Sequence, residues 1–93
     1  MFKIPRVNVI ESDEGFSVEV LGPTGLLYKE GAKTLHIESE YVIGPAGLGI
    51  YKDSIRAWDP PYDGSYIDKH KRDRIVDNIC RAFRFRGFEI EVV

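Results

Sequence analysis

Residues 74–93 read RIVDNICRAFRFRGFEIEVV, and the spacing of the apolar residues changes once along this segment. In the first part they recur at the three- and four-residue intervals of one helical face, which holds Ile75, Val76, Ile79, Cys80, Ala82 and Phe83. Gly87 follows, at the position where a glycine commonly ends a helix. From Phe88 to Val93 apolar residues occupy alternate positions, as in a strand. Ser65 and Asp68 have the spacing of a weak capping box, so we expect the helix over about residues 66–86 and the last strand over 88–93.

The segment before residue 54 is rich in strand signals. Phe16, Val18 and Val20 alternate with polar residues, which predicts a half-buried strand. The clearest alternation places Leu35, Ile37, Tyr41 and Ile43 on one face and His36, Glu38 and Glu40 on the other. Turn residues recur about every 8–12 residues and leave no room for a helix between neighbouring strands. The pattern therefore favours an antiparallel meander over parallel strands joined by helices.

Residues 54–65, SIRAWDPPYDGS, interrupt both patterns. Two adjacent prolines exclude a helix interior and a central strand, which predicts an ordered connector. The chain has 93 residues and is expected to form a single domain around one core. The predicted fold class is α+β. We expect five or six short strands over about residues 7–53 to form an antiparallel β-meander sheet packed against one long C-terminal helix, with a final C-terminal strand after it.

The composition is that of an ordinary soluble protein, with 43% hydrophobic and 30% charged residues and a net charge of −2. The single cysteine, Cys80, cannot form an internal disulfide. No apolar run approaches the ~20 residues of a membrane span, and the first residues do not resemble a signal peptide. These features predict a cytoplasmic protein that does not enter a membrane.

The charges are distributed unevenly along the chain. Residues 1–67 hold six basic and ten acidic residues, whereas residues 68–86 hold seven basic and three acidic ones. We interpret the basic segment as a solvated helix face that balances the acidic remainder. The alternative is a small nucleic-acid-binding domain that uses the basic helix. We do not favour nucleic acid as the partner, because the pI is 5.6 and no known binding motif is present.

The sequence offers no set of residues typical of catalysis or metal binding. Cys80 lies within the apolar helical stripe, where a buried thiol stays inert, so neither His36 nor His70 makes it a convincing nucleophile. The two histidines and one cysteine match no zinc-site spacing. The glycines of residues 44–49 lack the order of a phosphate-binding loop. We therefore predict that the protein is not an enzyme and needs no cofactor or metal.

The connector is the most suggestive surface feature for protein contact. Trp, Tyr and Arg dominate interface hot spots, and a stiff loop loses little entropy on binding. The predicted partner-binding residues are Arg56, Trp58, Asp59, Tyr62 and Asp63 of the connector, with Glu38 and Glu40 of the outward strand face. The alternative is that Trp58 covers the core while Pro60 and Pro61 only steer the chain into the helix.

Three segments resemble a known family: GPTGLLYKEG (residues 22–31), YKDSIRAWDPPYDG (51–64) and RDRIVDNICRAFRFRGFEIEVV (72–93). They are similar to the immunity protein 74 family of bacterial polymorphic toxin systems, over about residues 16–93. The sharpest pieces are WDPP (58–61) and RIVDNI (74–79). The resemblance implies a non-enzymatic, cytosolic α+β protein that binds and neutralises a cognate toxin domain without a cofactor. It supplies no functional residues.

Two further functions remain open beside toxin neutralisation. The first is an interaction adaptor with an unknown partner, and the second is the nucleic-acid-binding domain described above. If the partner is a nuclease toxin, Glu19, Glu38 and Glu40 form a candidate patch that mimics its polyanionic substrate and speeds association. The sequence does not specify the oligomeric state.

Overall fold

The structure is a computed structural model that describes residues 1–22, 24–44 and 47–93. These residues form seven strands, one α-helix and one 3-10 turn. In chain order they are β1 (Phe2–Arg6), β2 (Val9–Ser12), β3 (Phe16–Gly22), β4 (Gly25–Glu30), β5 (Lys33–Tyr41), β6 (Leu48–Ile50), η1 (Lys52–Ser54), α1 (Lys69–Phe85) and β7 (Ile90–Val92). The predicted α+β class is therefore confirmed.

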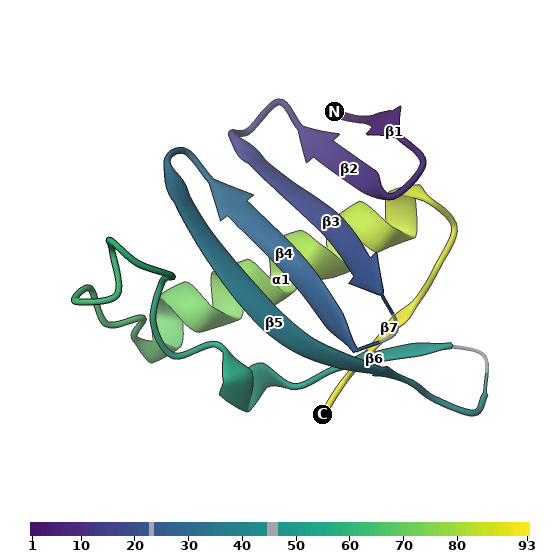
Figure 1. The fold of residues 1–93 in the computed structure, drawn as a ribbon. Coiled ribbons are helices and arrows are strands. Elements are labelled where there is room, and N and C mark those ends of the chain that lie inside the picture. Colours follow the sequence, from purple (N-terminus) through teal and green to yellow (C-terminus); the bar gives the residue numbers. More distant parts are fainter. Residues whose placement is uncertain (23, 45–46) are drawn as a thin grey trace.

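All seven strands belong to one curled sheet, in which they follow the order of the chain. Strands β1 to β6 pair antiparallel with their neighbours, so the predicted meander is confirmed for them. The chain then crosses the sheet through α1, and β7 pairs parallel with β6. Figure 1 shows α1 lying across one face of β2 to β5, whereas the described residues place no helix over the other face.

The expected number of strands, five or six, is wrong, because the sheet has seven. The strand outside the expected range is β1, which precedes residue 7 and contains Pro5. Proline is tolerated there because β1 is an edge strand, whose outward side needs no backbone donor. Four of its five residues are exposed, so it shows no apolar alternation. β7 is also shorter than expected, since Phe88 still donates its backbone N–H to Phe83 at the end of α1 (2.9 Å).

The core lies between α1 and the inner sheet face. The predicted helical stripe buries Ile75, Ile79, Ala82 and Phe83, while Val76 and Cys80 are only half-buried. In β5, Leu35 and Ile37 are buried as expected. Tyr41 and Ile43 were expected on the same face, but they are 74% and 107% exposed. The reason is that the end of β5 projects beyond α1 (Figure 1), so no element among the described residues covers this part of the face.

The helix begins later than the capping-box pattern predicts. Its N-cap is Asp68, whose carboxylate accepts a hydrogen bond from the backbone N–H of Lys71 (2.8 Å). The preceding residues are held in an extended contact with the connector: Ile67 donates its N–H to the Arg56 carbonyl (2.9 Å). That contact prevents a helical conformation there. At the other end Gly87 adopts a φ of +89°, as expected for the residue that terminates a helix.

A polar seam joins α1 to the end of β4. Lys71 of the helix forms an ion pair with Glu30, and the hydroxyl of Tyr28 donates to the same carboxylate (2.8 Å). Asn78 in turn donates to the Tyr28 hydroxyl (3.0 Å). Partial burial opposes ionisation of Glu30, but these hydrogen bonds outweigh it and lower its pKa. The seam therefore fixes the position of the helix along the strand.

The basic residues of α1 also pair with carboxylates elsewhere. Arg81 forms two hydrogen bonds to Glu14 in the β2–β3 turn, at 3.0 and 3.2 Å, and lies 3.4 Å from Asp77. The hydrogen bonds from Arg81 lower the pKa of Glu14. This pairing agrees with the interpretation that the basic helix balances the acidic remainder of the chain.

Replacing Ile79 by alanine tests the packing of the helix. Ile79 is fully buried, so Ile79→Ala is expected to reduce the free energy of unfolding by about 2–5 kcal/mol. Urea unfolding monitored by circular dichroism measures this difference. The control is Arg74→Ala on the exposed side of α1, which is expected to change stability by less than about 0.5 kcal/mol. Equal effects of the two variants would contradict the assigned helical face.

The seam predicts a dependence of stability on pH. The pKa of Glu30 in the folded protein is below its ordinary value of 4.5, so its contacts stabilise the fold fully only above that pH. This contribution is lost as the pH falls through the folded-state pKa. In urea unfolding at pH 3 to 6, Glu30→Gln is expected to lose less stability on acidification than the wild type. Glu91→Gln, at an exposed position, should keep the wild-type slope; an unchanged slope in Glu30→Gln would disprove the role of the seam.

Candidate partner-binding surface

The connector packs along β5 on the side that β4 does not occupy. Asp59 donates its backbone N–H to the carbonyl of Thr34 (2.8 Å), and Tyr51 donates to that of Glu38 (2.9 Å). The Ser54 hydroxyl accepts from the N–H of Glu38 (3.1 Å). These bonds use backbone groups that would otherwise lie open at the side of the strand. The connector is thus held against β5 at Ser54 and at Asp59.

Trp58 anchors the connector from within the core. Only 5% of the residue is exposed. Its ring stacks on Tyr28 with a centroid separation of 6.3 Å, and the ammonium groups of Lys33 and Lys71 lie 5.5 and 6.0 Å from it. Of the two roles considered for Trp58, the structure shows the core position. Its ring therefore offers little surface to a partner.

Asp59 holds the connector from the outer side of the sheet. Its carboxylate lies 2.6 Å from the Nδ1 atom of His36 and accepts a hydrogen bond from the Thr34 hydroxyl (3.2 Å). The Asp59 side chain is 28% exposed and that of His36 is 66% exposed. Asp59 thus positions the connector and places His36 at the surface.

Three of the predicted partner-binding residues remain exposed around one surface, which we name the connector surface. It consists of His36, Glu38, Glu40, Tyr51, Asp53 and Arg56. All except Glu40, together with Ser54, line a shallow hollow of about 470 Å³. The neighbouring Glu40 carboxylate raises the pKa of the Tyr51 hydroxyl, which places Glu40 beside the other residues of this surface. Tyr62 and Asp63 are exposed farther along the loop, where the Lys33 ammonium lies 5.8 Å from the Tyr62 ring.

The sequence did not identify Tyr51 and Asp53 as part of this surface. Tyr51 reads as the end of a strand, and Asp53 has no periodic pattern around it. Their positions depend on η1, whose first turn begins directly after Tyr51. No signal in the local sequence shows that this turn lies beside the outward residues of β5.

The connector surface keeps a negative charge. In the part of the chain that the structure describes, no ion pair includes Glu38, Glu40 or Asp53. Arg56, the cation of this surface, directs its Nε–H to the backbone carbonyl of Asp53 (2.7 Å). Glu19 does not extend the negative patch, because Leu27 separates it from β5 and Arg6 lies 3.5 Å from its carboxylate.

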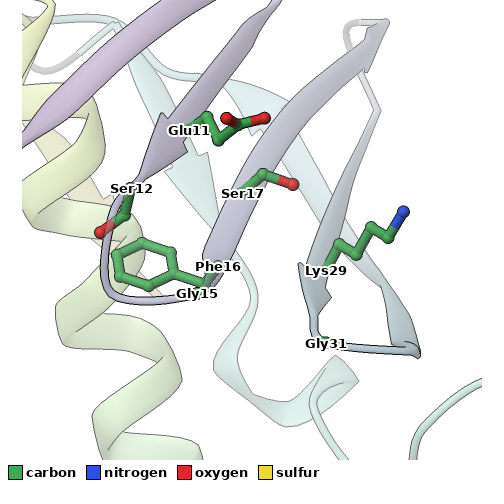
Figure 2. A pocket seen from close by; sticks show the side chains of 7 residues that line it. All are labelled: Glu11, Ser12, Gly15, Phe16, Ser17, Lys29 and Gly31. Carbon is green, nitrogen blue, oxygen red and sulfur yellow. The ribbon is translucent and has the colours of Figure 1, made fainter.

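A second hollow lies at the tips of the β2–β3 and β4–β5 hairpins. Figure 2 shows Glu11, Ser17 and Lys29 pointing to one side of the strands, whereas Ser12 and Phe16 point to the other. Glu11 forms an ion pair with Lys3 (3.0 Å), and Ser17 stands between Glu11 and Lys29 in the register. This arrangement places opposite charges on either side of a hydroxyl but brings no histidine or thiol to it.

The remaining reactive groups lie apart from both hollows. Cys80 is half-buried in α1, and burial raises the pKa of its thiol, which disfavours the reactive thiolate. Among the described residues, no group of three His, Cys, Asp or Glu side chains is placed to hold a metal ion. Within the same residues, no helix combines the length and apolar character that a membrane crossing requires.

Replacing Trp58 separates its packing role from a binding role. Because the ring is buried against Tyr28, Trp58→Ala is expected to reduce the free energy of unfolding by about 3–5 kcal/mol. Thermal and urea unfolding measure the loss. Tyr66→Ala, at an 82% exposed aromatic next to the connector, is the matched control and should have little effect. A stable Trp58→Ala variant would show that the core does not depend on this ring.

Comparison with known proteins identifies the family. The family model described as Immunity protein 74 matches residues 17–93, which is most of the chain. No curated protein and no solved structure matches the sequence. Immunity protein families are generally non-catalytic and act on a toxin partner. The match includes β3 except for its first residue, β4 to β7, the connector and α1. The chain therefore belongs to the immunity protein 74 family, whose general role is immunity to a toxin.

Proposed function

We propose that this protein acts in the bacterial cytoplasm, where it binds a cognate toxin domain of a polymorphic toxin system and neutralises it by covering the toxin's functional surface. Neutralisation requires no catalysis by the immunity protein itself. Membership of the immunity protein 74 family supports the general role. We choose the connector surface as the binding face because three of its carboxylates have no ion-pair partner in the described residues.

The connector surface suits binding because it is fixed before the partner arrives. Trp58 holds it from inside and the contact between Asp59 and His36 holds it from outside. A surface that is already ordered loses less conformational entropy on association. Its outer residues Glu38 and Glu40 lie on the sheet face that no helix covers, so a broad partner surface can approach them.

The charge of this surface favours a basic partner. Uncompensated carboxylates attract a positively charged toxin face and accelerate association. If the toxin is a nuclease, that face is its substrate-binding site, and Glu38 and Glu40 occupy the position of phosphates. Tyr62 and Asp63 extend the contact along the connector loop. Steric coverage of the toxin site then blocks its substrate.

The nucleic-acid alternative has less support. Lys69, Lys71, Arg81 and Arg84 of α1 each lie within ion-pair distance of a carboxylate. A phosphate backbone would have to displace these contacts. An adaptor that binds no toxin would use the same surface. Only the identity of the partner distinguishes that role from immunity.

Affinity purification from the native organism identifies that partner. The tagged chain is used as bait at low ionic strength, and mass spectrometry analyses the captured proteins. We expect a polymorphic toxin whose isolated toxin domain is inhibited when the purified chain is added. Capture of a non-toxic protein alone would instead support the adaptor, and capture of nucleic acid that salt releases steeply would support the third alternative.

Reversing two charges tests the binding face. The double variant Glu38→Lys and Glu40→Lys is expected to slow association with the captured toxin about ten-fold or more at low salt, because attraction becomes repulsion. Surface plasmon resonance measures the rate, and the difference should shrink as salt screens the charges. The control is Asp13→Lys, in an exposed turn outside the connector surface, which gives up only a solvent-exposed contact with the N-terminal ammonium. Equal rates for wild type and double variant would exclude this face.

A further inference from the structure

A third hollow lies at the end of the molecule opposite the connector. It is bounded by the β1–β2 turn, by β3, by the end of α1 and by the segment that leads into β7. Figure 1 places the β1–β2 turn and this segment beside one another, far from residues 54–65. The hollow has a volume of about 250 Å³. Small-molecule sites typically measure ~300–1,000 Å³, so this one suits a single large side chain.

The lining of the hollow is mostly apolar; it also includes Asn8, whose side-chain amide donates to the Val20 carbonyl (3.2 Å). Ile10 and Phe83 are 3% and 6% exposed and form its base. Val7 and Phe88 stand at the mouth and are 82% and 54% exposed. Val20 completes the wall. Apolar residues that remain exposed around an apolar recess are typical of an interaction site, since a partner's side chain gains burial there.

A cation is fixed at the same mouth. Arg86 lines the hollow, and its Nη1 atom donates to the backbone carbonyl of Val7 (2.7 Å). That bond holds the guanidinium beside the recess. None of the ion pairs among the described residues includes Arg86. The remaining N–H groups of a guanidinium match the geometry of a carboxylate.

From this pairing of an apolar recess with a fixed cation, we propose that the hollow binds an acidic peptide segment of a partner protein. An apolar side chain of that segment enters between Val7 and Phe88, and a carboxylate on the adjacent residue bonds Arg86. This site is separate from the connector surface and accepts the opposite charge. Its occupation therefore does not depend on toxin binding, and both surfaces can be used at once.

Three peptides test the proposed chemistry on the full chain. The probe is acetyl-Asp-Leu-Asp-amide; acetyl-Asn-Leu-Asn-amide removes the charge and acetyl-Asp-Ala-Asp-amide removes the anchor. Titration followed by ¹H–¹⁵N NMR should shift the amides of Val7, Val20 and Phe88. The two control peptides are expected to bind about ten-fold more weakly. Shifts confined to other residues, or equal binding of all three peptides, would overturn the proposal.

Substitutions at the mouth test the role of charge in both directions. Because Val7 is 82% exposed, Val7→Glu and Val7→Lys should both fold like the wild type. Val7→Glu is expected to weaken binding of the probe about ten-fold, whereas Val7→Lys strengthens it. The same affinity in both variants would refute the site. The other possible occupant of the hollow is a second copy of this chain, and analytical ultracentrifugation of the free chain tests for it. Self-association that Val7→Glu abolishes would assign the hollow to a second copy and overturn the proposal.

Discussion

The contact between Tyr28 and Trp58 joins the three parts of this molecule. Tyr28 is fully buried at the centre of the sheet, with one ring face toward Trp58 of the connector. Its hydroxyl receives a hydrogen bond from Asn78 of α1 and donates one to Glu30 at the end of β4. Burial raises the pKa of this phenol, so the hydroxyl stays protonated and keeps its role as donor. Tyr28 therefore contacts sheet, helix and connector at once and contributes to the relative position of all three.

The placement of α1 also determines which charges remain at the surface. Because the helix lies beside the ends of the β2–β3 and β4–β5 hairpins, Arg81 and Lys71 reach Glu14 and Glu30. Several cations of the basic segment are therefore paired with carboxylates of the sheet and its turns. The carboxylates on the outer side of β5 lie on the face that the helix does not cover, beyond these cations. A chain of small net charge thus presents a distinctly acidic surface, which is the property that the proposed toxin contact uses.

The apolar hollow at the opposite end has a different origin. It forms where the β1–β2 turn, the sheet, the end of α1 and the segment that leads into β7 meet. Exposed Val7 and Phe88 and the fixed Arg86 give it an amphipathic mouth. The molecule therefore carries two separate hollows of different character, one shallow and lined by charged residues and the other recessed and mostly apolar.

The sequence by itself determined the local elements. The spacing of Ile75, Ile79 and Phe83 gave the buried face of the helix, Gly87 gave its end, and turn residues gave the antiparallel meander, because each of these follows from backbone geometry and the period of burial. The resemblance to the immunity protein 74 family was likewise readable from sequence and is confirmed over residues 17–93.

Only the tertiary structure decided what the connector does. An aromatic side chain in a proline-rich loop has the same local pattern whether it faces solvent or a core, so the burial of Trp58 depended on where Tyr28 lies. Strand β1 could not be predicted from the sequence, because an exposed edge strand has no apolar period. Tyr41 does follow the apolar period of β5 but is exposed, because burial requires a covering element and the end of β5 projects beyond α1. Contacts between distant segments carry no signal in the spacing of neighbouring residues.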